Sequence, residues 1–245
     1  MTIRDYQIGQ DLEYEKPVSE KIEFQIDKAK YFAFQLNDVD RHQSDLKLME
    51  DWSKDAAQQM KIAIDTSILH TVFADAAAQN SGNNAGAISG NISLGAAGAP
   101  VAVTRDNVLD VIIDTSQALD EQNAPDEGRY LVIPAWMSAM LKKSDLRDAS
   151  IMGDGTSAFR NGRLGMLDRY EVYVSNNLAK TNDGGTSVTN MIFGHKKALT
   201  FAAQMTKMDH IPNQKDFGEL VRGLNVYGFK VIDPLRFGHL YAYKG

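Results

Sequence analysis

Residues 45–78, DLKLMEDWSKDAAQQMKIAIDTSILHTVFADAAA, form a long stretch that contains neither Pro nor Gly. Apolar and small side chains recur in it at steps of three and four residues, which places them on one face of an α-helix. This face comprises Met49, Trp52, Ala56, Met60, Ala63, Ile64, Ser67, Ile68, Val72 and Phe73. Such a helix would be roughly 50 Å long, whereas a compact domain of this size has a radius of gyration of about 18 Å. We therefore expect a core helix with Trp52 buried, in a flat, elongated molecule.

Composition excludes several classes of protein. The chain has 245 residues, of which 43% are hydrophobic and 24% charged, enough for a substantial core in one large domain or two small ones. The net charge of −6 argues against a surface that grips nucleic acid tightly. Cysteine is absent, so disulfides and thiolate metal sites are excluded. No apolar run approaches the roughly 20 residues of a membrane span, and the N-terminus does not resemble a signal peptide. We expect a protein made and used without secretion.

The N-terminal region reads as extended structure. Ile22, Phe24 and Ile26 alternate with polar residues, the period of a half-buried strand, and residues 31–36 form a second apolar run. Residues 2–6 could supply the partner strand of a hairpin, with its turn near residues 13–17. Because that hairpin is charged on both faces towards its tip, it would either extend into solvent or lie on another chain. An ordinary surface hairpin fits the pattern as well.

Gln79–Pro100 is rich in Gly, Ala, Asn and Ser, which indicates a flexible loop with too little side-chain volume to pack. A short strand at residues 92–94 is compatible with this pattern. Thr104 is then expected to cap a helix over residues 106–120. The expected later elements are strands at 129–133, 165–174, 190–194, 220–233 and 235–243, and helices at 135–142 and 196–204. Strands and helices do not alternate regularly, which favours an α+β fold over a doubly wound sheet.

Signatures of catalysis are weak. The five histidines are never at ligand spacing from one another, and no cysteine could complete a metal site. Ser175 lacks the strand-to-helix turn of a hydrolase nucleophile, and Asp154 stands alone among glycines. We therefore predict no catalytic, cofactor-binding or metal-binding residues. An α+β enzyme with residues 79–100 as a lid remains a remote alternative.

Several segments resemble the major capsid proteins of tailed double-stranded DNA bacteriophages, whose fold is shared with encapsulin shells. The segments are IDKAKYFAFQLNDVD at 26–40, LDEQNAPDEGRYLVIP at 119–134, GRLG at 162–165, YVSN at 173–176 and VYGFKV at 226–231. Together they extend over nearly the whole chain. Family members usually begin with a further arm and the rising strand of a hairpin, so the resemblance implies an N-terminally short chain.

The resemblance implies a division into domains. Residues 1–36 correspond to a truncated β-hairpin arm that reaches over a neighbour. Residues 37–100 correspond to a peripheral domain, with a spine helix at 45–78 and a flexible loop at 79–100. Residues 101–201 correspond to the axial domain, and residues 202–245 return to the peripheral domain with a long strand at 220–233.

The same resemblance implies a structural subunit that assembles into pentamers and hexamers around a packaged DNA genome. Its partners would be copies of itself, scaffolding and portal proteins, and DNA only non-specifically, without a membrane; it would assemble in the bacterial host cytoplasm and reside in the virion. The alternative is an encapsulin-like compartment. Expected assembly contacts are Glu13, Tyr14, Lys16, Lys28, Pro212, Asn213, Lys215 and Asp216. Some relatives carry a lysine–asparagine crosslink, but Leu220 occupies the asparagine region, so we predict none.

Overall fold

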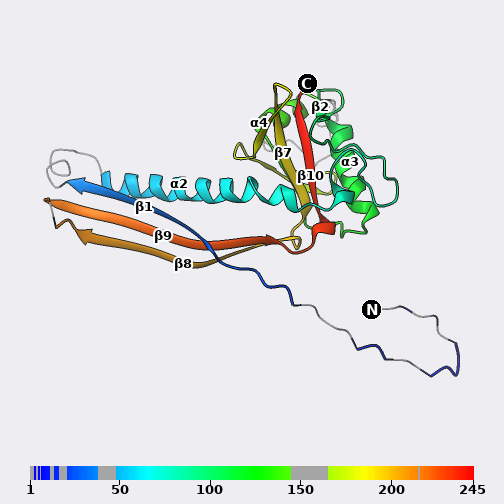
Figure 1. The fold of residues 1–245 in the computed structure, drawn as a ribbon, viewed down its shortest axis with the longest axis horizontal. Coiled ribbons are helices and arrows are strands. Elements are labelled where there is room, and N and C mark those ends of the chain that lie inside the picture. The colour runs from blue at the N-terminus through cyan, green and yellow to red at the C-terminus, as the bar shows by residue number, and fades with distance from the viewer. Residues whose placement is uncertain are drawn as a thin grey trace, which may run out of the picture.

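The computed structural model describes residues 21–37, 48–144, 165–214 and 216–245, together with positions 3, 5, 7–11 and 14–16. The chain forms a long rod attached to a globular domain, and its N-terminal segment runs away from both (Figure 1). The rod consists of one helix and a three-stranded sheet, whereas the globular domain is built on a seven-stranded sheet. The α+β class and the elongated shape agree with expectation.

The rod helix is α2 (Leu48–Leu69). It rises about 1.5 Å per residue and so extends roughly 33 Å. The expected stripe is largely confirmed, since Ala56, Met60, Ala63 and Ile64 lie on its more buried side. Trp52 is an exception: 41% of its surface is exposed, so the expectation that it is buried was wrong.

The helix ends earlier than expected. Two short 3₁₀ helices, η1 (Val72–Asp75) and η2 (Ala78–Asn80), follow α2 instead of its last turns. The Thr71 hydroxyl donates to the carbonyl of Ser67 at 2.9 Å, a local bond that competes with continued helix. Val72 and Phe73 continue the apolar period, but they pack against the globular domain rather than along the rod.

The rod sheet has the order β1-β9-β8, and all pairings are antiparallel. Its strands are β1 (Lys28–Asn37), β8 (Leu199–Pro212) and β9 (Gly218–Val231). The long strand expected at residues 220–233 is therefore confirmed. The helix expected at residues 196–204 is wrong, because Leu199 onward pairs with β9 along the rod. This non-local ladder overrides the local helix preference of the alanines.

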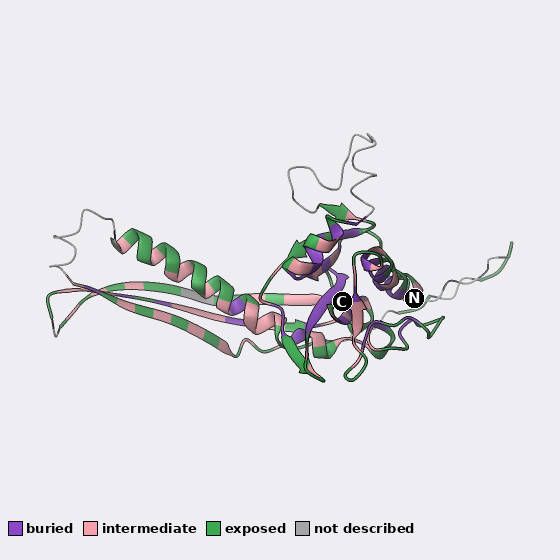
Figure 2. Cartoon of the chain, turned by 90° about the horizontal axis from the view of Figure 1, so that it is seen from above, coloured by how far each residue is buried: buried purple, intermediate pink, exposed green. Residues whose placement is uncertain are grey.

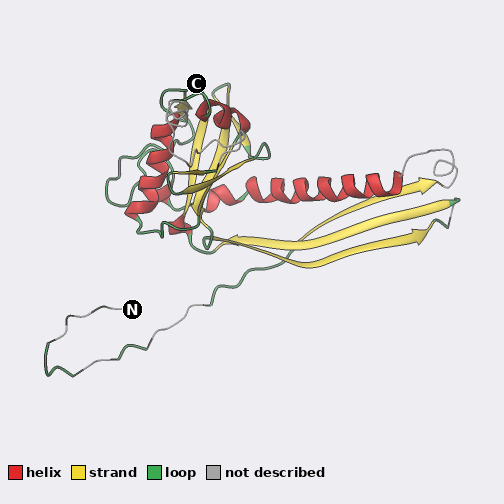
Figure 3. Ribbon diagram, turned by 180° about the vertical axis from the view of Figure 1, so that it is seen from behind, coloured by secondary structure: helices red, strands yellow, loops and turns green. Residues whose placement is uncertain are grey.

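The N-terminal hairpin is not seen as expected. Residues 21–27 are not a strand, and residues 28–37 pair with β9 rather than with an earlier segment. Part of the expected partner strand and turn lies outside the described residues. The segment before β1 crosses the rod sheet and then leaves the body (Figures 1 and 3).

The globular sheet has the order β2-β10-β7-β3-β5-β4, with β6 paired to β7. Its strands are β2 (Val101–Val103), β3 (Arg129–Ile133), β4 (Met166–Leu167), β5 (Tyr170–Val174), β6 (Lys180–Asp183), β7 (Thr186–His195) and β10 (Phe237–Lys244). The pairs β2–β10 and β3–β5 are parallel, and the other pairs are antiparallel. A short 3₁₀ helix, η4 (Pro234–Arg236), precedes β10.

Helices α3 (Val108–Glu121) and α4 (Ala135–Leu141) supply apolar side chains to the main core, together with one face of this sheet. Asn107, not Thr104, lies at the start of α3, and its Oδ1 accepts from the Thr104 backbone N–H at 2.7 Å. The segment at 79–100 is irregular, as expected, but it is packed: Ala85, Ile92 and Leu94 are buried in the core. The expectation that it has too little volume to pack was wrong, because small side chains suit close approach to α3 and β10.

A second, smaller core joins the rod to the globular domain. Successive side chains of β7 and β3 point to opposite faces of the sheet. Phe193 and Leu131 therefore pack in the main core, whereas Ile192 and Val132 lie on the opposite face. There they pack with residues of η1, the end of α2 and the starts of β8 and β10. Buried residues accordingly concentrate in the globular domain and at this junction, whereas the rod is mostly intermediate or exposed (Figure 2).

Candidate assembly surfaces

The two faces of the rod sheet differ. Alternate residues of β1 face α2: Phe34 meets Trp52 edge to face at 6.0 Å between centroids, and Phe32 lines a small groove with Met60. The intervening residues point to the opposite, uncovered face, where Tyr31 is 78% exposed. One helix thus covers one face of the rod, and its outer face stays open.

A charged cluster lies on this outer face. Asp209 of β8 accepts from Nη2 of Arg222 at 3.0 Å and pairs with Nζ of Lys207 at 3.2 Å. The hydrogen bonds from Arg222 and then Lys207 lower the pKa of Asp209. The cluster borders a shallow pocket of about 510 Å³ that Tyr31 and Leu224 also line. The outer face therefore combines exposed apolar side chains with an excess of cationic ones.

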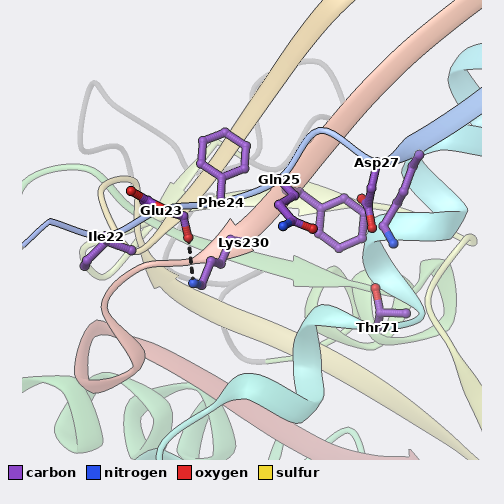
Figure 4. A pocket seen from close by; sticks show the side chains of 9 residues that line it. Ile22, Glu23, Phe24, Gln25, Asp27, Thr71 and Lys230 are labelled. Carbon is purple, nitrogen blue, oxygen red and sulfur yellow. Dashed lines mark hydrogen bonds between the residues drawn. The ribbon is translucent and has the colours of Figure 1, made fainter.

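The arm root, residues 22–27, crosses β9 beyond the end of β1 (Figure 4). The Lys230 ammonium donates to the carbonyl of Glu23 at 3.0 Å. Gly228 permits the crossing, because a Cβ there would lie 2.4 Å from the Gln25 carbonyl oxygen. The root encloses an open pocket of about 770 Å³ between the arm, β9 and Thr71. The arm thus leaves the rod at a defined point.

The far tip of the rod is the turn between β8 and β9. Asn213 N–H donates to the Gly218 carbonyl at 2.9 Å, which closes the turn. Asp216 Oδ2 accepts from the amides of Gln35 at 3.4 Å and Asn37 at 3.3 Å, so it ties the tip to the end of β1. Phe217 beside it is exposed.

The expected contact residues fall into three places. Pro212, Asn213 and Asp216 come together at the rod tip. Lys28 lies at the opposite end of β1, about 30 Å away at roughly 3.3 Å per residue, with its Nζ 5.2 Å from the centre of the Phe229 ring. Tyr14 and Lys16 are exposed in the N-terminal segment. The two remaining residues, Glu13 and Lys215, lie outside the described residues.

Sequence reasoning missed the arm root. Gly228 and Lys230 have no local motif, although a glycine inside a strand is a sign of close backbone approach and could have indicated Gly228. Glu23 contributes through its backbone carbonyl, which no sequence pattern reveals.

A half-buried histidine lies at the junction of rod and globular domain. His239 of β10 packs against Phe73 of η1, with ring centroids 5.1 Å apart, and its Nε2 lies 3.0 Å from Asn190 Oδ1. Asn190 in turn donates to the Ala179 carbonyl at 3.1 Å. Burial lowers the pKa of His239 to about 4. The imidazole is therefore neutral near pH 7 and serves packing.

The segment 119–134, one of those that carried the family resemblance, has a structural role. Arg129 is buried and donates to the carbonyls of Ala124 at 2.7 Å and Pro125 at 2.9 Å. Its guanidinium also pairs with Asp120 at 2.7 Å, and Arg169 bridges the same carboxylate at 2.8 Å. These bonds fix the connection from α3 to β3.

Within the described ranges, no three His, Asp or Glu side chains gather as a metal site would require. Ser175 contributes only a local bond, its Oγ accepting from the Asn177 backbone N–H at 3.2 Å. No helix in the described part of the chain is long and apolar enough to span a membrane.

A half-covered rod, a globular head and a projecting arm define the class of shell-building capsid subunits. Residues 19–238 match the family described as phage capsid protein. The chain belongs to this family and is a structural, non-enzymatic capsid subunit of the virion, which assembles with copies of itself.

Several solved structures share the fold of this chain. A structure from Mycobacterium phage Che8 is similar with a TM-score of 0.65 and 26% identity, over 88% of this chain and 71% of that one. The capsid of cyanophage P-SCSP1u has a TM-score of 0.65 and 16% identity, over 96% of this chain and 81% of that one. An encapsulin complex from Synechococcus elongatus has a TM-score of 0.56 and 9% identity, over 87% of this chain and 72% of that one. At these identities the likeness is one of fold alone. No curated protein sequence matches the chain.

Proposed function

We propose that the chain is the repeating subunit of an icosahedral shell, forming pentamers and hexamers that enclose a packaged DNA genome. In this proposal the rod is the peripheral domain, the globular domain is the axial domain, and the N-terminal segment is the arm that reaches a neighbour. The net charge of −6 suits a wall that holds DNA only non-specifically. Scaffolding and portal proteins would be further partners, and assembly would take place in the bacterial host cytoplasm.

The observation that carries this proposal is the open outer face of the rod. The three strands present an exposed Tyr31, a partly exposed Leu224 and the charged cluster of Arg222, Lys207 and Asp209, and a neighbour that covers the apolar side chains would stabilise them. Identical subunits supply that cover repeatedly, and many modest contacts then add up in a closed shell.

Negative-stain microscopy with sedimentation velocity at several protein concentrations tests this proposal. We expect rings or closed particles from the wild-type chain, and a reduced assembled fraction for Tyr31→Asp, which places a charge on the outer face. Ala97→Asp is the matched control, since Ala97 is an exposed residue of the globular domain. A wild-type chain that stays monomeric under all assembly conditions overturns the proposal.

A further inference from the structure

A tight turn at residues 86–90 projects from the globular domain. Its base is closed by two backbone bonds between Ala85 and Ile92, of 2.8 and 3.0 Å, and both residues are buried in the main core. Gly86 adopts φ +97°, and a Cβ there would lie 2.8 Å from Glu121 Oε2. The base of the turn is thus fixed and leaves no room for a side chain at Gly86.

One carboxylate holds the tip of this turn. Glu121 Oε2 accepts from the backbone N–H groups of Ile88 at 2.7 Å and Ser89 at 2.9 Å, and Gln117 Nε2 donates to Oε1 at 2.9 Å. The bonds from Ser89 and Gln117, with that from Ile88, lower the pKa of Glu121 to about 2. The carboxylate is therefore ionised near pH 7, where it accepts all three hydrogen bonds.

The held tip presents an apolar side chain to water. Ile88 is 82% exposed although its own backbone is anchored. Ile113, which is also exposed, lies two helical turns before Glu121 on the same side of α3. An isoleucine this exposed adds nothing to the stability of the isolated chain by burial. Because its backbone is already held, it costs little backbone ordering entropy when its side chain enters an interface.

We propose that Ile88, held out by Glu121, is a contact through which one subunit binds a second copy of this chain, an inference that rests on the proposed shell function. The charge at the tip selects the partner. The Glu121 carboxylate lies against the backbone N–H groups of Ile88 and Ser89, so the group beside the exposed isoleucine is an anion. An acidic border repels the phosphates of DNA and attracts a cationic protein surface.

The contact is heterologous and separate from the rod. The segment between η2 and β2, which carries the turn, lies at the side of the globular domain away from the rod (Figure 1). Because like-charged acidic patches repel each other, Ile88 meets a different, cation-bearing surface on the second copy, as in a ring of identical subunits. Lys180, Lys196 and Lys197 are exposed cations that the same globular domain offers.

Three variants test this inference by sedimentation velocity, with thermal unfolding as the measure of folding. Ile88→Asp is expected to lower the assembled fraction roughly tenfold, the scale of an interface hot spot, without moving the unfolding temperature. Glu121→Gln keeps the size of the side chain but removes the negative charge that accepts the backbone bonds of the turn. We therefore expect faster amide exchange at Ile88 and Ser89, and a smaller loss of assembly than in Ile88→Asp. Ala97→Asp, the same charge elsewhere in the segment, should assemble normally.

The outcomes separate the two proposals. If the wild type assembles and Ile88→Asp assembles equally well, the Ile88 contact is overturned and the shell function stands. If the wild type forms no assembly at all, both are overturned. If Ile88→Asp fails to fold, the Glu121→Gln variant provides the test. Faster amide exchange at Ile88 and Ser89 in that variant, together with undiminished assembly, also overturns the Ile88 contact.

Discussion

Trp52 shows how the environment of a single residue alters its energetic role. It lies on the side of α2 that meets β1, where its ring contacts Phe34 edge to face, but nearly half of its surface faces solvent. A fully buried tryptophan would lose about 3–5 kcal/mol on truncation to alanine. The structure supports a smaller cost.

We predict that Trp52→Ala lowers the free energy of unfolding by about 1–2 kcal/mol, because the lost contribution is one aromatic pair and part of one buried ring face. Urea unfolding measures this change. Phe34→Leu is the matched variant: it removes the same ring pair from the other side, so the double variant should cost less than the two single changes together. Additive costs would contradict the pairing.

His239 makes stability depend on pH. Its pKa is about 4 in the folded protein and 6.5 in the unfolded chain, so above pH 6.5 the imidazole is neutral in both states. As the pH falls towards 4, the unfolded chain takes up a proton that the folded protein excludes. Stability is therefore lost on acidification, by about 2–3 kcal/mol at pH 4.5 from this residue alone.

Urea unfolding at pH 7.5 and 4.5, for wild type and His239→Gln, isolates this contribution. Glutamine retains a donor for Asn190 and does not titrate, so the variant should lose less stability on acidification than the wild type. The other titrating groups cancel in the comparison. An equal loss in both proteins would show that His239 does not have a lowered pKa in the folded protein.

Among the elements, the arm root depends on one glycine in β9. We predict that Gly228→Ala displaces residues 22–27 and costs about 1–3 kcal/mol, since the new methyl group overlaps the arm backbone. Hydrogen exchange and limited proteolysis at the arm root measure the displacement. Lys230→Met removes only the bond to Glu23 and should loosen the root less. If residues 22–27 of Gly228→Ala are as protected from exchange and proteolysis as in the wild type, the arm root does not cross β9 at Gly228.

The elements also show which features were readable from sequence. The period of α2 and the alternation of β9 are local patterns, and each was predicted correctly. A helix was predicted at residues 196–204, whose alanines suit one locally, but residues from Leu199 onward belong to β8 because of the ladder with β9. The packing of residues 79–100 depends on the groove that α3 and β10 provide, which no local pattern shows.

The candidate assembly surfaces also differ in how far the sequence alone could predict them. Pro212 and Asn213, which the family resemblance implies as contacts, lie at the rod tip, and their role as contacts stays a prediction. The arm root and the held turn at Ile88 depend on backbone groups of one segment meeting side chains far along the chain. Such pairs become visible only when the fold has brought them together.

At the scale of the whole molecule, core and contact surfaces are segregated. Buried side chains concentrate in the globular domain and at its junction with the rod, whereas the rod is thin and the N-terminal segment lies beyond it (Figures 1 and 2). The N-terminal side chains of Ile3 and Ile8 are each 98% exposed. Folding of the body should therefore be independent of this segment.

We predict that deleting residues 1–20 leaves the unfolding temperature within about 2 °C of the wild type, because the deletion leaves both cores intact. Assembly should nevertheless be lost, since an arm that gives its own chain little packing acts on a neighbour. Sedimentation velocity and differential scanning calorimetry measure the two effects on the same sample. A variant in which Ile3, Ile8 and Tyr14 are all changed to Ser keeps the length and charge of the segment, and it should reproduce the assembly defect if apolar contacts hold the arm to its neighbour. Normal particles from the deleted chain would show instead that the rod and globular domain suffice, and a large fall in unfolding temperature would show that the segment belongs to the folded body.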